Sequence, residues 1–374
     1  MRPIKIEFQP DQQSYPIMIG HGILSELAAE IKRQNIGTDA VIVTNPVIHQ
    51  HHGAELSSAL RDAGFGVGFL DVPSGESSKS AECAFDLIRR IAEEYAGKNV
   101  FIIAFGGGVV GDLAGYVAAA YRRGIPYVQV PTTLLAQIDS AMGGKVAVDL
   151  PFGKNLVGAF YHPRLVYTDV DLLRTLDLRQ IRNGLSEAVK YGVICDKNLF
   201  AFIEANADAL LRLEQKPLTE TVYLCSRIKA SIVSRDERES QGLRTILNFG
   251  HTIGHAVEAS SAYEPYQHGE AVALGMRAAA EISLLCGMIP EDDARRLNDL
   301  LTRLGLPEKI KGMPLDTLLE PMRHDKKFHT GRNRFVLMNA LGSVKIVEDV
   351  PEEAIRRAVS KYLQQPGEDA GTLF

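Results

Sequence analysis

The feature that most constrains this chain is a glycine-rich turn between a buried strand and a helix. Gly106, Gly108 and Gly111 fit the pattern G-x-G-x-x-G directly after the apolar run 100–105, and a helical segment follows at 113–120. Glycines in this position let backbone N–H groups approach a pyrophosphate, whose charge the helix N-terminus favours. The turn therefore predicts a dinucleotide site or, without a ligand, a tight strand–helix connection.

The surrounding sequence alternates between strands and helices. Short apolar runs, typical of strands buried on both faces, occur at 40–44, 100–105, 127–130 and 165–168, with a helical segment at 80–96. Such strand–helix–strand units join parallel strands by right-handed crossovers. The pattern predicts an α/β domain with a Rossmann-like parallel sheet, and residues 1–8 also alternate like a strand.

The pattern changes after about residue 171, where helical periodicity replaces strands. Helical segments are expected at 185–193, 201–213, 218–234, 252–262 and 270–286, followed by a strand at 334–339. We therefore expect residues 1–174 to form the α/β domain and residues 175–374 a mainly α-helical domain. The last residues, 364–374, are expected to be a frayed tail.

Two details separate the glycine-rich turn from an ordinary Rossmann site. The turn follows a strand deep in the domain, whereas the usual motif follows the first strand. About 20 residues further on, where an acid would hold the ribose, the chain reads Pro131-Thr132-Thr133. A dinucleotide would therefore bind by a different scheme.

Cations gather around small residues in a chain that is acidic overall. The 41 Lys and Arg against 46 Asp and Glu give a net charge of -5, which excludes a globally basic nucleic-acid-binding protein. Arg122 and Arg123 precede two Gly-Lys steps, at Lys145 and Lys154, and Asn155 follows the second. Lysines after flexible turns can reach a phosphate as point charges. The pattern favours a phosphate or carboxylate pocket over solvated surface lysines.

Histidines and one glutamate form a set of candidate metal ligands. His251 and His255 lie four residues apart on one helical face, His268 stands at an expected helix start, and Glu187 lies in an otherwise apolar helical segment. Catalytic zinc takes three ligands from His and Asp or Glu and keeps one position open. Thr252 stands where the H-E-x-x-H metalloproteases have their general base. Spacing alone does not distinguish which histidines bind a metal from those that are structural.

Several sequence-wide features are those of a cytoplasmic globular protein. Cys83, Cys195, Cys225 and Cys286 lie far apart without a C-x-x-C motif, which argues against a disulfide framework or a cysteine zinc site. No apolar run approaches the ~20 residues of a membrane span, and the amino terminus lacks the apolar core of a signal peptide. We expect a cytoplasmic protein that binds neither membranes nor nucleic acid.

Five motifs follow one another in a specific order. They are GGGVVGDLAGYVAAAYRRGIPYVQVPTTLLAQIDSAMGGKVAVDLPFGKNLVGAFYHP, GLSEAVKYG, DERESQGLRTILNFGHTIGHAVEA, HGEAVALGM and RHDKK. Together they resemble the 3-dehydroquinate synthases, a family of sugar-phosphate cyclases, over roughly residues 40 to 345. The resemblance implies a homodimeric, phosphate-eliminating lyase of the shikimate pathway that uses NAD and one divalent metal, Zn²⁺ or Co²⁺.

The implied reaction converts 3-deoxy-D-arabino-heptulosonate 7-phosphate to 3-dehydroquinate and phosphate. In the family this proceeds by transient oxidation with NAD, phosphate elimination, re-reduction, ring opening and aldol closure. The substrate carries a carboxylate and a phosphate, which explains a positive pocket in an acidic chain.

The resemblance also implies which residues act. The metal ligands would be Glu187, His251 and His268, which leaves His255 to face the substrate. The NAD contacts would be Asn45, Ser74, Gly75, Glu76, Lys79, Gly107, Gly108, Val109, Gly111, Asp112, Thr132, Thr133, Lys145, Lys154, Leu172, Leu173, Arg174 and Thr175. The substrate contacts would be Arg123, Lys145, Lys154, Asn155, Lys190, Lys229, Arg244, Asn248, His255 and one or both of Lys326 and Lys327. The catalytic residues would be Asp139, Lys145, Lys190, Lys229, Asn248 and His255.

Within that set, the substrate's two anionic groups have different expected partners. Arg244 with Lys326 or Lys327 suits the carboxylate, and Arg244 would share a face with Asn248 if 243–249 is helical. The phosphate partners would be Arg123, Lys154, Asn155 and His255. The chain departs from the family in having one extra residue between Asp236 and Arg244, and Asp149-Leu150 where Asn-His is frequent.

Three alternatives remain open. Aminocyclitol-forming cyclases such as 2-deoxy-scyllo-inosose synthase share the fold, but tend to have an acid at the position of Asn248 and act on a substrate without a carboxylate. Metal-dependent alcohol or polyol dehydrogenases would not need so many cations in one pocket. A binding module without catalysis is disfavoured because the dinucleotide turn and the metal set are both intact.

Overall fold

The computed structural model describes residues 14–239, 242–260, 266–324 and 333–364, and of 321–324 the backbone alone. The chain forms two compact units. The α/β unit consists of Met1–Pro131 and Gly143–Asp169, and the helical unit of Thr132–Met142 and Val170–Phe374. The chain therefore leaves the α/β unit after residue 131, returns at 143 and leaves again after 169.

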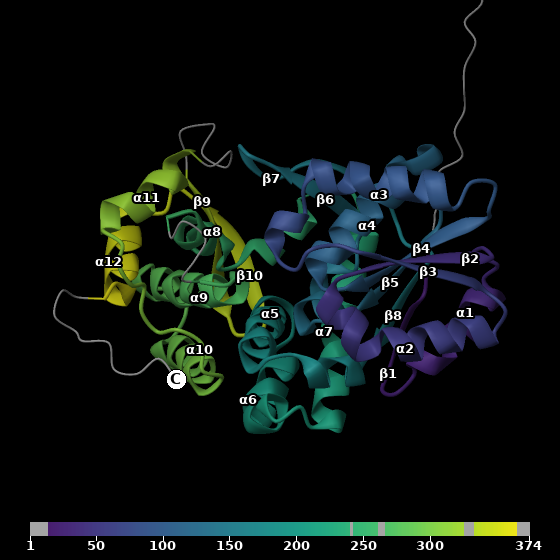
Figure 1. The fold of residues 1–374 in the computed structure, drawn as a ribbon. Helices are drawn as coiled ribbons and strands as arrows, with labels where there is room; N and C mark the ends of the chain where they lie inside the picture. Colours follow the sequence, from purple (N-terminus) through teal and green to yellow (C-terminus); the bar gives the residue numbers. More distant parts are fainter. Residues whose placement is uncertain (1–13, 240–241, 261–265, 325–332, 365–374) are drawn as a thin grey trace, which may run out of the picture. The chain divides into compact units, whose positions relative to one another are not determined.

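The α/β unit is built on a six-stranded, entirely parallel sheet (Figure 1). Its order is β1 (Ile17–Gly20), β8 (Leu165–Asp169), β5 (Tyr127–Pro131), β4 (Val100–Gly106), β2 (Asp39–Thr44) and β3 (Gly66–Asp71). The four strands expected from their apolar runs are confirmed. The two strands that were not expected lie at the sheet edges, where β1 is short and β3 contains two glycines and no continuous apolar run.

Helices cover both faces of this sheet. Figure 1 shows α3 (Ala81–Glu94) and α4 (Gly108–Ala120) on one face, and α1 (Leu27–Arg33) and α2 (Pro46–Asp62) on the other. On the first face, alternate residues of β4 such as Ile102 pack with α3 and α4 in one core cluster. Burial from both sides explains why the β4 sequence has no polar alternation.

A separate antiparallel hairpin also belongs to the α/β unit. It pairs β6 (Lys145–Leu150) with β7 (Gly153–Phe160), in a region where the sequence indicates only glycine turns. Nearly all of β7 is exposed, so it lacks the apolar alternation that identifies a half-buried strand.

The helical unit confirms the expected change of pattern after residue 171. Its described helices are α5 (Leu178–Cys195), α6 (Lys197–Leu211), α7 (Gln215–Arg235), α8 (His251–Ser260), α9 (His268–Leu285), α10 (Glu291–Arg303), α11 (Leu315–His324) and α12 (Glu352–Tyr362). The expected strand at 334–339 is β9 (Arg334–Ala340), which pairs with β10 (Ser343–Glu348). Helix α9 is buried along most of its length and packs against α5, α8 and α12. Among the described residues, no helix is long and apolar enough to span a bilayer.

Candidate active site

Glycines bring together the three helices that carry the candidate metal ligands. At Gly275 of α9, an added Cβ would lie 1.8 Å from the carbonyl oxygen of Gly250, which directly precedes α8. At Gly269, an added Cβ would lie 2.1 Å from the carbonyl oxygen of Asn183 on α5. The Asn183 side chain also accepts a hydrogen bond from the Gly269 N–H. These two glycines let α9, which begins at His268, pack closely against α5 and against the start of α8.

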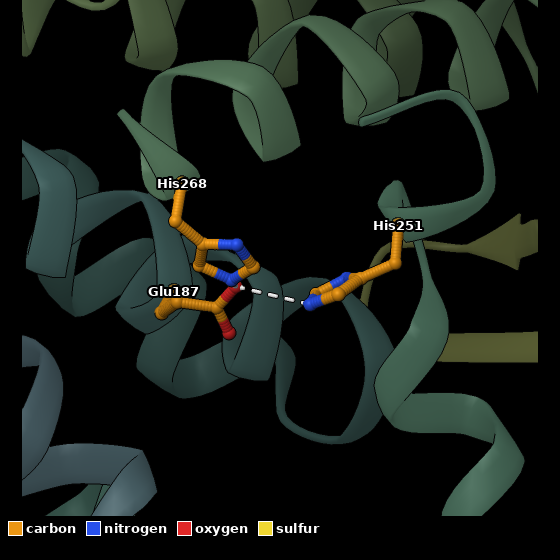
Figure 2. Close-up of side chains that lie close together, drawn as sticks. All are labelled: Glu187, His251 and His268. Carbon is orange, nitrogen blue, oxygen red and sulfur yellow. Dashed lines mark ion pairs between the residues drawn. The ribbon is translucent and has the colours of Figure 1, made fainter. Parts of the chain in front are cut away.

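Glu187, His251 and His268 converge through this packing, although they are scattered along the chain (Figure 2). Glu187 Oε1 lies 3.5 Å from His251 Nε2 and 3.6 Å from His268 Nε2. One ligand atom from each of the three lies within 4.8 Å of the others. The three expected ligands therefore come together in space, in the combination of two imidazoles and one carboxylate that suits a divalent metal.

The outer nitrogens of both imidazoles have partners of their own. His251 Nδ1 lies 3.1 Å from the carbonyl oxygen of Phe249, to which it can only donate. His268 Nδ1 lies 3.4 Å from Glu258 Oε1. Such contacts orient a ligating histidine and leave the Nε2 lone pair for the metal. In both residues, Nε2 is the atom that faces Glu187.

The electrostatics of Glu187 and His251 also fit a cation. Both carboxylate oxygens of Glu187 are buried and accept no well-aligned hydrogen bond from the described residues. Burial opposes its ionisation, but the nearby Lys190 and the two imidazoles outweigh burial and hold the pKa of Glu187 well below its usual value. Burial, with the positive charge of Lys190, lowers the pKa of His251 far below 6.5 and keeps that imidazole neutral, as a ligand must be.

A second combination of possible ligands, His255, Glu258 and His268, overlaps the first. His255 is exposed and its ring meets that of His251 edge-on, with centroids 5.4 Å apart. Glu187 and His251 are far less exposed than His255. Solvent therefore screens the attraction between a metal ion and its ligands less in the first set than in the second. Glu258 then serves as the outer partner of His268.

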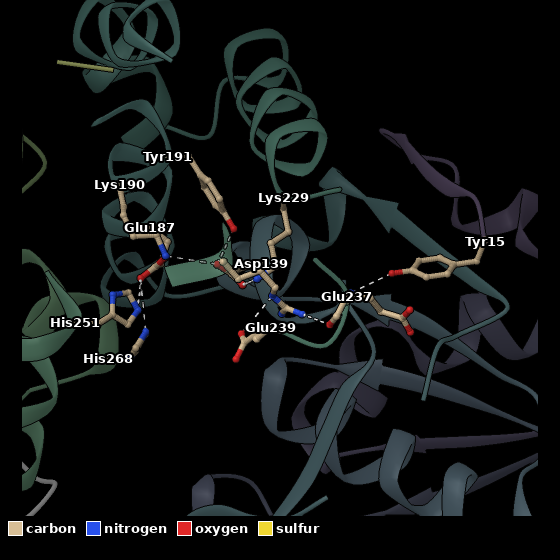
Figure 3. A network of polar contacts seen from close by, with 12 residues as sticks. Tyr15, Asp139, Glu187, Lys190, Tyr191, Lys229, Glu237, Glu239, His251 and His268 are labelled. Carbon is tan, nitrogen blue, oxygen red and sulfur yellow. Dashed lines mark hydrogen bonds and ion pairs between the residues drawn. The ribbon is translucent and has the colours of Figure 1, made fainter. Parts of the chain in front are cut away.

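Asp139 forms a second polar cluster with two lysines and a tyrosine (Figure 3). Its Oδ1 accepts a hydrogen bond from Lys229 Nζ at 2.5 Å, and its Oδ2 accepts one from Tyr191 Oη at 2.7 Å. Lys190 Nζ lies 3.8 Å from Oδ2 and also forms an ion pair with Glu187. Lys190, next to Tyr191 on α5, thus links the Asp139 cluster to the metal ligands.

These charges stabilise one another. Burial opposes the charged form of Asp139, but Lys229 and Lys190 outweigh it and lower the pKa of Asp139 below 3.8. Burial likewise opposes charge on Lys190, but Glu187 and Asp139 raise the pKa of Lys190 above 10.5. Burial and the adjacent Asp139 raise the pKa of Tyr191 well above 10. Lys190 therefore stays an ammonium group and Tyr191 keeps its proton, whereas burial lowers the pKa of Lys229 below 10.5 despite its contact with Asp139.

Arg244 and Asn248 line a pocket of about 220 Å³ together with Glu239, Thr245, Thr252, Arg334, Phe335 and Val336. The segment that carries them is a 3-10 helix, η6 (Leu243–Asn248), and not an α-helix. A 3-10 helix has three residues per turn, so residues four apart do not share a face as the sequence suggested, although both reach this pocket. Arg244 is buried, and its guanidinium donates to the Glu237 carbonyl at 2.8 Å. Lys326 and Lys327 lie outside the described residues.

The expected NAD contacts of the α/β unit follow the carboxyl ends of neighbouring strands. Asn45 follows β2 and caps α2, while Gly107 follows β4 and precedes α4. The strands β2 and β4 are adjacent, yet the chain runs from β2 outward to β3 and from β4 toward the other edge. Such a reversal of strand order is where α/β sheets bind ligands. At Gly106, an added Cβ would lie 2.6 Å from Val110 Cβ, so the turn has no room for a side chain.

The buried Lys79 connects helix α4, which follows the glycine-rich turn, with the β6–β7 hairpin. Lys79 donates to Asp112 at 2.6 Å and to the Asn155 side chain at 2.5 Å. Burial raises the pKa of Asp112 to about 6, although Lys79 opposes that change. Lys154 is partly exposed and lies 3.6 Å from Glu76, which belongs with Ser74 and Gly75 to the segment after β3.

The other expected contacts are divided between the two units. Lys145 opens β6, and Arg123 lies in the α/β unit in a left-handed conformation, with φ of 63°. By contrast, Thr132 and Thr133 belong to the helical unit. So do Leu172, Leu173, Arg174 and Thr175, within the 3-10 helix η5 (Val170–Thr175).

Sequence reasoning did not single out Tyr191 or Glu258. Tyr191 carries no signal, because its relevant neighbour, Asp139, is 52 residues away in the chain. Glu258 did have a signal, since it lies three residues after His255 and seven after His251 on the same helix. Residues at this spacing share a helix face.

The fold and the site define a sugar-phosphate cyclase. Similar architecture occurs in the 2-epi-5-epi-valiolone synthase ValA from Streptomyces hygroscopicus subsp. jinggangensis 5008, solved with NAD+ and Zn2+ (TM-score 0.86, 25% identity, 97% of this chain and 99% of that one). It also occurs in a 2-deoxy-scyllo-inosose synthase complexed with carbaglucose-6-phosphate, NAD+ and Co2+ (TM-score 0.84, 27% identity, 93% and 97%).

Sequence similarity narrows the class further. Residues 69–183 match the family described as 3-dehydroquinate synthase N-terminal, and residues 184–328 match 3-dehydroquinate synthase C-terminal. The 3-dehydroquinate synthase of Desulforamulus reducens is 43% identical over 357 residues, which are 95% of this chain and 99% of that protein. The chain belongs to the 3-dehydroquinate synthase family. The expectation drawn from the five motifs is thereby confirmed.

Proposed function

We propose that this chain converts 3-deoxy-D-arabino-heptulosonate 7-phosphate to 3-dehydroquinate and phosphate, using NAD and one divalent metal, Zn²⁺ or Co²⁺. The observation that carries the proposal is the convergence of Glu187, His251 and His268 in a chain of this family. Membership of the family supports the reaction, and the titles of the two cyclase structures support the cofactors.

Glu187, His251 and His268 would hold the metal, and the turn at 106–111 would hold the NAD pyrophosphate. When bound, the metal polarises a substrate hydroxyl and NAD accepts and returns hydride, so that NAD is not consumed. The outer contacts to Phe249 and Glu258 keep the two imidazoles oriented before the metal arrives.

The protein's cations bind the substrate's anionic groups. The buried Arg244 guanidinium, whose Nε lies 3.3 Å from Glu239 Oε1, lines the pocket with Asn248. A planar guanidinium can grip a carboxylate with two parallel hydrogen bonds. Lys190 and Lys229, paired with Glu187 and Asp139, supply positive charge for substrate oxygens. We assign Arg123, Lys154, Asn155 and His255 to the phosphate.

The direct test is product analysis with the purified chain, the heptulosonate phosphate, NAD and Zn²⁺. We expect 3-dehydroquinate and inorganic phosphate in equal amounts, and loss of both when the metal is removed by a chelator. Glucose 6-phosphate, the type of substrate that lacks a carboxylate, should remain unconverted. Cyclisation of glucose 6-phosphate with no turnover of the heptulosonate phosphate would refute the proposal and favour an aminocyclitol-forming cyclase.

We further propose a homodimer in the cytoplasm. Phe152, Leu156 and Phe160 are large apolar side chains that the β6–β7 hairpin leaves exposed, and exposed apolar patches are typical of interaction surfaces. Four free cysteines support a reducing compartment. Light scattering should give twice the chain mass of 41.0 kDa, and a single-chain mass would contradict the dimer.

A further inference from the structure

The hydroxyl group of Tyr191 has no part in the roles assigned above. Tyr191 is fully buried on α5, and its Oη donates to Asp139 Oδ2 at 2.7 Å. A buried phenol needs a hydrogen-bond partner, because an unpaired hydroxyl costs free energy. Asp139 is also the partner of Lys229, so this hydroxyl contacts the candidate catalytic cluster directly (Figure 3).

The geometry shows how the hydroxyl affects the two lysines. Asp139 Oδ1 holds Lys229 Nζ at 2.5 Å, whereas Oδ2 is occupied by Tyr191. Lys190 Nζ is only 3.8 Å from that same Oδ2, but its close ion pair is with Glu187. Lys190 therefore lies between the carboxylates of Asp139 and Glu187. Whether Asp139 Oδ2 already accepts a hydrogen bond from Tyr191 influences which of the two carboxylates Lys190 approaches.

We infer that Tyr191 is a positioning residue that divides the two buried lysines between two carboxylates. Its hydrogen bond to Asp139 Oδ2 orients Asp139 toward Lys229. Lys190 is thereby left paired with Glu187, which is one of the candidate metal ligands. Without the hydroxyl, Oδ2 would be a bare anionic oxygen, and the Lys190 ammonium could move toward it. This inference rests on the proposed function, in which both lysines contact the substrate.

The test is Tyr191→Phe, which removes one oxygen atom and keeps the ring. We expect kcat to fall about 10- to 100-fold, the loss typical of one hydrogen bond to a charged group. KM should change less than kcat, because Arg244 and the phosphate partners are untouched. The matched control is Tyr167→Phe, since Tyr167 is also buried and donates a single bond, to the Ile23 carbonyl at 2.8 Å. The control should lower the melting temperature to a similar extent and leave kcat unchanged.

A double-mutant cycle with Asp139→Asn tests whether Tyr191 acts through Asp139. The double variant should be no slower than Asp139→Asn alone, because the hydroxyl has then lost the charge it orients. A wild-type kcat in Tyr191→Phe, a fall matched by Tyr167→Phe, or additive losses in the cycle would overturn the inference. The wild-type enzyme serves as the separate check: if it fails to convert the heptulosonate phosphate, the proposed function is wrong, independently of Tyr191.

Discussion

At the scale of single residues, Glu258 is the outer partner whose role can be measured most directly. It faces His268 Nδ1 and does not touch Glu187 in any described contact. Outer carboxylates that orient a ligating histidine are worth about 10- to 100-fold in metal affinity. We therefore expect Glu258→Ala to weaken Zn²⁺ binding by about that factor, as measured by competition with a chelating dye. Glu281→Ala, which removes an equally shielded carboxylate paired with Lys361, should leave Zn²⁺ affinity unchanged. Equal affinities in the two variants would contradict this role.

Arg244 gives a second prediction at this scale. Arg244→Ala should lower kcat/KM for the heptulosonate phosphate about 10- to 100-fold, because a charge-assisted contact is lost. Arg244→Lys should recover only part of the loss, since an ammonium cannot form two parallel bonds to a carboxylate. Arg296→Ala, which removes a half-exposed partner of Glu204, is the control and should retain full activity. Unchanged steady-state kinetics in Arg244→Ala would show that the carboxylate binds elsewhere.

At the scale of secondary-structure elements, the approach of α9 to α5 determines where His268 lies. In Gly269→Ala, the new methyl group would lie 2.1 Å from the backbone oxygen of Asn183, so one of the helices must move. We expect a lower melting temperature together with weaker Zn²⁺ binding, both measured on the purified variant. Gly53→Ala is the control, because there the atoms nearest the new methyl group belong to the His49 imidazole, in the α/β unit. It should leave Zn²⁺ binding close to wild type. Tight Zn²⁺ binding in Gly269→Ala would show that the ligand geometry does not depend on this contact.

At the scale of the whole molecule, the enzyme's net reaction leaves NAD unchanged. A small amount of NAD, well below the substrate concentration, should therefore support complete conversion. Absorbance at 340 nm should not rise in proportion to product, whereas phosphate release should. One NADH formed per product molecule would instead indicate an alcohol or polyol dehydrogenase.

Much of this molecule was predictable from the sequence because its strongest signals are local. The apolar run of β4, the glycines after it and the helical periods of α5 to α9 are each visible within short windows. The family motifs added the metal ligands, which spacing alone could not choose among His251, His255 and His268. Their convergence depends on glycine contacts between distant helices, and these leave no periodic pattern.

Other features were missed for equally physical reasons. The β6–β7 hairpin is exposed along one strand and so lacks alternation. The 3-10 geometry of η6 depends on its surroundings, since Asp236 accepts hydrogen bonds from the backbone of Leu243 and Arg244. The transfer of residues 132–142 to the helical unit has no sequence signal either, because it is defined by tertiary contacts.

The Asp139 to Lys229 contact also has a consequence for how the protein is made. The two residues are 90 positions apart, so Asp139 leaves the ribosome long before the lysine that neutralises it. At typical synthesis rates of about 5–20 residues per second, the delay is on the order of 5–20 s. Throughout that interval the segment 132–142 has no complete α7 to pack against. The nascent chain must therefore carry the Asp139 carboxylate without its Lys229 partner, and a ribosome that stalled before residue 229 would hold it in that state.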